Sequence, residues 1–179
     1  VLDALAAIIV ARHLGIADAA IIRALSKFTG AKRRFEVLGE KGDITFVDDY
    51  GHHPTEIRAM LDSARDYFGD RRLLVVFQPH QFSRTRLLLE GFAHSFSKAD
   101  QLLVAPILPV RDSAEERQAI SSEDLVAAIN KVSDNAKAFA SFAKITDYLK
   151  LKLRAGDVVL SLGAGKNSEW IQDFYNHFG

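Results

Sequence analysis

From about residue 36 onward, the chain alternates short, nearly continuous apolar runs with longer stretches in which apolar residues recur at helical spacing. The apolar runs are EVLGE with ITFVDD, then LLVVFQ, QLLVAPI, AKAFA and DVVLSLG. Such alternation is typical of a mainly parallel sheet that carries helices on both faces. The sequence therefore predicts an open, Rossmann-like α/β domain over residues 36–179.

Helices are expected between these runs, at about residues 54–68, 83–96, 121–131, 145–153 and 169–178. The polar stretch 111–124 is predicted to be a mobile loop.

A short helical segment precedes this domain. Apolar residues recur at helical spacing over residues 2–10, Gly15 is placed to end that helix, and a second helix is expected near residues 18–28. TGAKRRF, residues 29–35, follows as a glycine-containing turn with three cations, which we interpret as a hinge. Residues 1–35 are thus expected to end another domain, and the initial Val suggests a piece of a longer protein.

Composition excludes several broad classes of function. Lys and Arg number 23, as do Asp and Glu, and the basic residues are scattered, so neither a nucleic-acid footprint nor an anionic membrane surface is indicated. The absence of cysteine excludes a disulfide framework and a thiol nucleophile, and it fits a cytoplasmic protein. No apolar run reaches the roughly 18 residues that span a bilayer.

Four polar segments follow predicted strands: DDYGHHP, FQPHQFSR, APILPVRDS and SLGAGKNS. Ligands of open parallel sheets bind outside the carboxyl ends of the strands, so all four segments should share one edge of the sheet.

DDYGHHP has two interpretations. Asp48, Asp49, His52 and His53 could be metal ligands, because carboxylate and imidazole suit divalent ions. Alternatively, Pro54 begins a helix that Asp49 or a His caps.

FQPHQFSRTR places His80, Arg84 and Arg86 where cations beside exposed backbone N–H groups make an anion site. The alternative is a solvated basic face with Phe82 packed inward. Two facing polar clusters favour a binding site.

SLGAGKNS suggests a phosphate loop but fails its spacing, which needs glycine at Leu160 and Ser or Thr at Asn167. We interpret it as a tight strand-to-helix turn. GAKRRFE also has two interpretations: a solvated basic turn, or a hinge arginine that reaches across domains and clamps a transferring phosphoryl group.

Taken in order, RRF, VDDYGHHPTEI, FQPHQFSRTR and LGAGKNS resemble the C-terminal part of the Mur ligases, ATP-dependent enzymes that add amino acids to UDP-muramyl precursors of peptidoglycan. VLDALAAIIVA resembles the end of their central ATPase domain. Within the family, DDYGHHP with FQPH is most similar to ligases that join L-alanine to UDP-N-acetylmuramate. Ligases that recycle a tripeptide tend to read DDFAHHP and lack FQPH.

The resemblance implies that ATP phosphorylates the substrate carboxylate and that the amine of L-alanine attacks the acyl phosphate. The phosphate loop, the magnesium ligands and the UDP-binding domain would all lie upstream. This piece alone is therefore expected to be inactive and to hold no metal or ATP by itself.

The resemblance also assigns residues. Arg34 and Asp49 are the expected catalytic residues: the first matches an arginine that reaches the nucleotide phosphates, the second an aspartate that helps to hold the nucleotide as domains close. Asp3, where the family usually has asparagine near the adenine, joins them as an ATP-binding residue.

Tyr50, His52, His80 and Arg84 match positions that face the amino acid and the substrate carboxylate. Gln81 stands in place of a common arginine, which removes one cation from the expected carboxylate site. Lys166 and Asn167 also depart from the family pattern, and the sequence does not explain them.

Two other functions stay open: a tripeptide-recycling ligase, and a non-catalytic module that binds a nucleotide or another anion. A bare metal-binding module is a weaker alternative.

Overall fold

A computed structural model describes residues 2–28 and 30–179. Thr29, the first residue of the expected hinge, lies outside the described residues. Contacts divide the chain into one unit that ends at Ala31 and a second unit, Lys32–Gly179. No helix in the described part of the chain is long and apolar enough to cross a membrane.

The first unit is a pair of helices, α1 (Leu2–His13) and α2 (Asp18–Ser26), as the spacing predicts. Gly15 takes a left-handed φ of 74° after α1, which L-residues with a Cβ adopt at a cost. Arg12 pairs with Asp18 at 2.8 Å across the connection. Apolar side chains remain exposed on this hairpin: Leu5, Ile9, Val10, Leu14, Ile16, Ile22 and Phe28.

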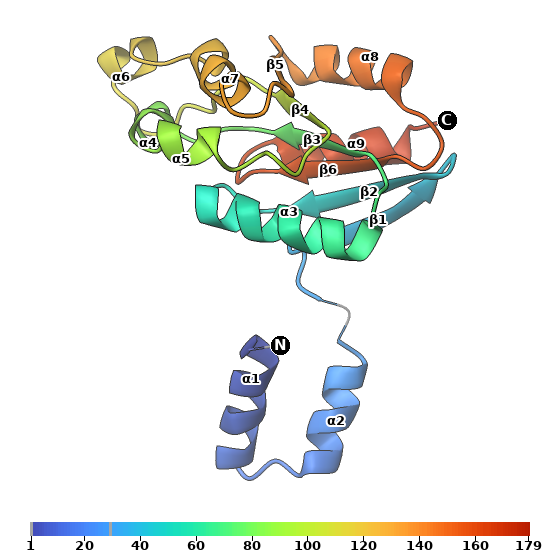
Figure 1. The fold of residues 1–179 in the computed structure, drawn as a ribbon. Helices are drawn as coiled ribbons and strands as arrows, with labels where there is room; N and C mark the ends of the chain where they lie inside the picture. Colours follow the sequence, from blue (N-terminus) through green and yellow to red (C-terminus); the bar gives the residue numbers. More distant parts are fainter. Residues whose placement is uncertain (1, 29) are drawn as a thin grey trace. The chain divides into compact units, whose positions relative to one another are not determined.

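The second unit is built on a six-stranded sheet in the order β1-β2-β6-β3-β4-β5 (Figure 1). The strands are β1 (Glu36–Lys41), β2 (Ile44–Asp49), β3 (Leu73–Phe77), β4 (Gln101–Val104), β5 (Ala136–Ala138) and β6 (Val158–Leu162). Only β1 runs antiparallel to its neighbour. The predicted open, mainly parallel sheet is confirmed.

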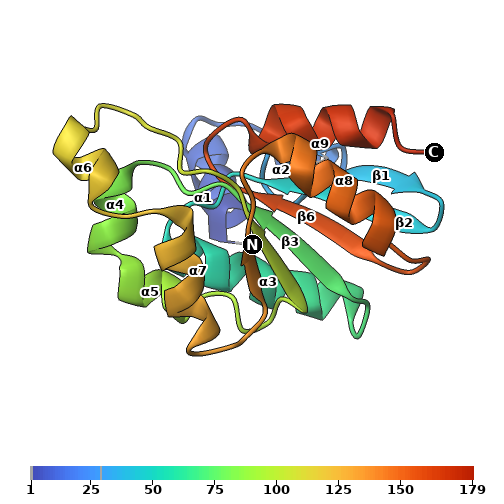
Figure 2. The same cartoon turned by 90° about the horizontal axis from the view of Figure 1, so that it is seen from above.

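Helices cover both faces of this sheet (Figures 1 and 2). They are α3 (Pro54–Phe68), α4 (Phe82–Leu87), α5 (Leu89–Ala93), α6 (Ala114–Gln118), α7 (Ser122–Asn130), α8 (Phe142–Lys152) and α9 (Asn167–Asn176). One buried cluster joins α3, α5 and α7 to the sheet through side chains such as Ile57, Phe92 and Leu125. A second cluster joins α8 and α9 to the opposite face.

The prediction of a single helix at 83–96 is wrong, because the chain bends between α4 and α5. Leu88 has φ −106° and ψ 16° at that bend. Adjacent residues on a straight helix point about 100° apart. The bend lets both Leu88 and Leu89 pack against the core.

The loop expected at 111–124 contains α6 and the start of α7, which corrects that prediction. Two capping boxes explain the helices: Ser113 with Glu116, and Ser121 with Asp124. Each pair satisfies N–H groups that a helix leaves without partners at its N-terminus. The S-x-x-E and S-x-x-D spacings were the available signal.

Candidate functional site

Four parallel strands end in register at one edge of the sheet. Asp49 of β2 lies opposite Leu162 of β6, Leu162 lies opposite Phe77 of β3, and Phe77 lies opposite Val104 of β4. The four polar segments that follow therefore emerge along one line, as expected. This edge is the candidate site.

Asp49 holds backbone groups from two sides of the site. Its carboxylate accepts hydrogen bonds from the N–H of Gly51 at 2.7 Å and of Phe35 at 2.8 Å. The side chain lies almost wholly buried, at 7% exposure. Asp49 thus ties the segment before β1 to the loop after β2.

His53, not Asp49, caps α3. Its Nδ1 accepts from the N–H of Thr55, while the Glu56 carboxylate accepts from the N–H groups of His52 and His53. Burial would raise the pKa of Glu56, but these backbone donors lower it. Within residues 2–28 and 30–179, no three His, Cys, Asp or Glu side chains are grouped to hold a metal ion.

Tyr50, His52 and His80 come together from two strand ends. The ring of Tyr50 lies 5.2 Å from that of His52, which in turn lies 6.2 Å from His80. The buried Nδ1 of His80 finds no hydrogen-bond partner among the described residues. Burial, and then the charges of Arg84 and His52, lower the pKa of His80 and favour its neutral form.

Gln81 binds the loop after β4 through both its backbone and its side-chain amide. It has a left-handed φ of 71°, its N–H donates to the carbonyl of Leu108, and its Nε2 donates to the carbonyl of Val110. Asp112 fastens the same loop to α4 by accepting from the N–H groups of Val110 and Ser83. Gln81 therefore has a structural function in the loop that follows β3.

SLGAGKNS forms the tight turn that the sequence indicates. The side-chain oxygen of Gln78 accepts from the N–H of Lys166 at 2.7 Å, and a Cβ on Gly165 would lie 2.3 Å from that oxygen. Asn167 is fully buried and donates to the hydroxyl of Ser161. These contacts give Asn167 and the backbone of Lys166 a structural function.

The two hinge arginines occupy different environments. Arg34 is exposed, with its guanidinium carbon 5.5 Å from the centre of the Tyr50 ring. Arg33 is half-buried, lies 4.8 Å from the same ring and donates to the carbonyl of Gly163 at 2.6 Å. Sequence reasoning missed Arg33, because nothing in the pattern distinguishes two adjacent arginines.

The two remaining predicted site residues are Asp3 and Arg84. Asp3 is exposed in the first turn of α1, in the separate helical unit. Arg84 is half-buried on α4 and close enough to His80 to affect its pKa.

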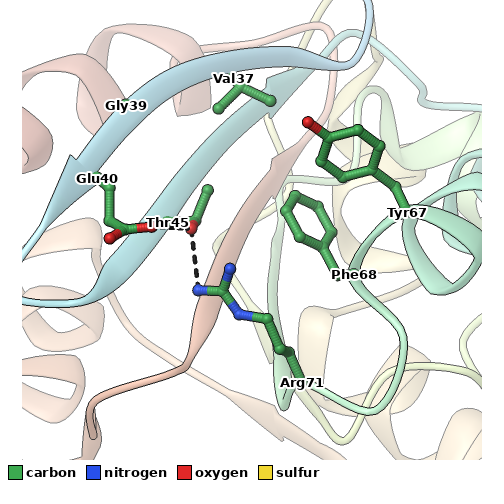
Figure 3. Close-up of a pocket in the computed structure, with 7 residues that line it drawn as sticks. All are labelled: Val37, Gly39, Glu40, Thr45, Tyr67, Phe68 and Arg71. Atoms are coloured by element: carbon green, nitrogen blue, oxygen red, sulfur yellow. Dashed lines mark hydrogen bonds between the residues drawn. The ribbon is translucent and has the colours of Figure 1, made fainter.

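A hollow of about 520 Å³ lies elsewhere, between β1 and the end of α3 (Figure 3). Thr45, near the start of β2, donates to Glu40 and accepts from Arg71, which precedes β3. These residues mark the amino-terminal edge of the parallel strands, opposite the polar segments. The hollow is therefore distinct from the candidate site.

Comparison with known proteins agrees with this fold. The family model "Mur ligase, glutamate ligase domain" matches residues 33–165. The chain is 44% identical over 167 residues to a UDP-N-acetylmuramate--L-alanine ligase of Desulfitobacterium hafniense, a match that covers 92% of this chain and 36% of that protein. The chain therefore spans about a third of the length of that relative.

Two solved structures are also similar. A UDP-N-acetylmuramate-alanine ligase from Thermotoga maritima superposes with a TM-score of 0.79 at 24% identity, covering 99% of this chain and 37% of the other. A murein peptide ligase from Psychrobacter arcticus gives a TM-score of 0.70 at 26% identity, covering 97% and 35%.

Proposed function

Because the chain belongs to the Mur ligase family, we propose that it is the C-terminal part of an ATP-dependent ligase that adds L-alanine to UDP-N-acetylmuramate. Residues 1–35 would end the central ATP-binding domain, and residues 36–179 would form the C-terminal domain. The unit boundary after Ala31 supports a division near this point. The exposed apolar side chains on α1 and α2 also suit a helix pair that packs inside a larger domain.

The observation that carries the proposal is the joint position of Arg34, Tyr50, His52 and His80 near one edge of the sheet. That edge presents a cation for phosphate beside an aromatic and imidazole cluster for an amino acid. A reaction between an activated carboxylate and an amine needs both groups held close together.

Each side chain then has a proposed function. Arg34, exposed and always charged, would stabilise the transferring phosphoryl group. Arg84 would pair with the carboxylate of L-alanine. His80, which favours its neutral form, can accept a proton from the alanine ammonium, while Tyr50 and His52 would shape the pocket around it.

Asp49 and Asp3 complete the proposed nucleotide side. Since backbone N–H groups occupy both oxygens of Asp49, it would act by holding Phe35 and Gly51 in place as the domains close. Asp3 would face the adenine of ATP through an acceptor oxygen.

ATP with Mg²⁺ would supply the phosphoryl group that activates the muramyl carboxylate. The exposed Arg34 fits a phosphate, but the described residues offer no cluster for the metal. From the resemblance to the Mur ligases we expect the magnesium ligands upstream, and we propose that the 179-residue chain alone is inactive. We also place the enzyme in the cytoplasm, where ATP and UDP-linked sugars are available.

The test is phosphate release by the full-length protein with ATP, Mg²⁺ and UDP-N-acetylmuramate, comparing L-alanine, glycine, L-serine and the tripeptide. Release that depends on L-alanine, with a product heavier by one alanyl residue, is expected. Release only with the tripeptide would favour the recycling ligase. Nucleotide binding without release under any condition would favour the non-catalytic module.

A further inference from the structure

Arg33, which precedes β1, bonds to segments that are far apart in the sequence, although neither its motif nor the family match singles it out. Its N–H donates to the Glu36 carboxylate at 2.7 Å, and its carbonyl accepts from the N–H of Tyr50 at 2.8 Å. Its guanidinium reaches the carbonyl of Gly163 and lies against the Tyr50 ring. One residue thus joins the loop after β2 to the turn after β6.

The backbone around Arg33 is held in an unfavourable conformation. Arg33 and Phe35 have φ values of 57° and 46°, the left-handed region that L-residues avoid. Such conformations persist when surrounding contacts enforce them. Here the contacts of Arg33 and the bond from the Phe35 N–H to Asp49 enforce them on both sides of Arg34.

The charge of Arg33 also balances a buried carboxylate. Asp48 is fully buried, and the Nε of Arg33 lies 3.6 Å from its Oδ2, which also accepts from the hydroxyl of Ser168. Burial raises the pKa of Asp48, while Ser168 and Arg33 oppose that effect. Arg33 is the cation that pairs with Asp48 among residues 2–28 and 30–179, so removing its guanidinium would remove this ion pair.

We propose that Arg33 is a positioning residue that fixes the backbone on both sides of Arg34 and the ring of Tyr50 against the end of β2. Its planar guanidinium is needed because it contacts the Gly163 carbonyl, the Tyr50 ring and Asp48 from one place. Arg34 would then move with the C-terminal domain as one rigid body, and any interdomain pivot would lie before Arg33. The kinetic consequence rests on the proposed function; the anchoring itself does not.

The test compares Arg33→Ala and Arg33→Lys with Arg71→Ala in the full-length protein. Arg71 is a matched control because, like Arg33, it is half-buried and its guanidinium donates to backbone carbonyls. Those carbonyls, of Gly156 and Asp157, lie at the opposite edge of the sheet. Amide hydrogen exchange is measured at Phe35 and Tyr50. We expect exchange roughly tenfold faster or more in Arg33→Ala, and unchanged at these amides in Arg71→Ala.

The kinetic arm measures kcat and KM with all three substrates. Displacement of Arg34 and Tyr50 should lower kcat by about 10²-fold and leave KM for UDP-N-acetylmuramate within about twofold. Arg33→Lys keeps the charge but not the planar donor, so it should recover only part of kcat. It also carries the test if Arg33→Ala fails to fold.

Unchanged exchange at Phe35 and Tyr50 would overturn the anchoring. Faster exchange with unaltered kcat, full recovery by lysine, or an equal loss of kcat in Arg71→Ala would overturn the positioning function. A wild-type protein without ligase activity would refute the proposed function instead, and the exchange measurement would still decide whether Arg33 anchors the segment.

Discussion

The imidazole rings of His52 and His80 lie 6.2 Å apart, although they follow different strands and are separated by all of α3. The order of the sheet brings them together, because β6 alone separates β2 from β3 and the strand ends are in register. Two positively charged imidazoles at this distance would repel each other. This repulsion adds to burial and to the charge of Arg84, which lower the pKa of His80 more strongly, so His80 favours its neutral form.

Stability should fall in mild acid because of His80. Its pKa in the folded state lies below the ordinary value of 6.5, so the unfolded chain binds the proton more readily. The contribution of neutral His80 is complete above pH 6.5 and is lost as the pH falls toward its folded pKa. The free energy of unfolding, measured with urea at pH 7.5 and at pH 5.5, should differ less between the two pH values in His80→Asn than in the wild type. His94→Asn, at an exposed position, is the control, and an equal change in both variants would contradict the prediction.

Arg84→Ala should raise KM for L-alanine in the full-length enzyme. A hydrogen bond to a charged group contributes about 1.5–3 kcal/mol, which corresponds to a rise of roughly ten- to hundredfold. Arg86→Ala, two residues along α4 and exposed, should leave KM for L-alanine nearly unaltered. Steady-state kinetics at saturating ATP measures both variants. Equal kinetics in Arg84→Ala and wild type would remove Arg84 from the amino-acid site.

The sequence predicts the sheet and its polar edge well, because buried parallel strands need long apolar runs and polar loops must follow them. It does not predict the bend at Leu88, which depends on how two adjacent leucines reach a core formed by distant elements. The function of Gln81 was hidden for a similar reason: its partners Leu108 and Val110 belong to a loop whose path no local pattern specifies. The contacts of Arg33 and Asp48 were missed for the same reason. Their partners, Gly163 and Ser168, lie more than a hundred residues further along the chain.

Glu56→Ala should destabilise the second unit by about 1 kcal/mol, because it removes half of the capping box of α3. It also removes the carboxylate that lies 3.4 Å from the Nδ1 of His52. Glu56→Gln keeps an acceptor oxygen at the same position and should cost less. Urea unfolding near pH 7.5 measures the free energy of unfolding of both variants. An equal loss in Glu56→Gln and Glu56→Ala would show that the charge, and not capping, is what matters at this position.

Gly165→Ala should loosen the turn after β6 by displacing one side chain. The new Cβ would lie 2.3 Å from the side-chain oxygen of Gln78 and 2.9 Å from Leu108, so the amide must move and lose its bond to the N–H of Lys166. Overpacking of this kind costs about 1–3 kcal/mol.

A double-mutant cycle isolates the cause of that loss. In a Gln78→Ala background the obstructing amide is gone, so Gly165→Ala should cost clearly less than it does in the wild type. Thermal or urea unfolding of the four proteins gives the interaction energy. If the two substitutions simply add, the cost arises from Leu108 or from the backbone of the turn, and Gln78 does not set the shape of this loop.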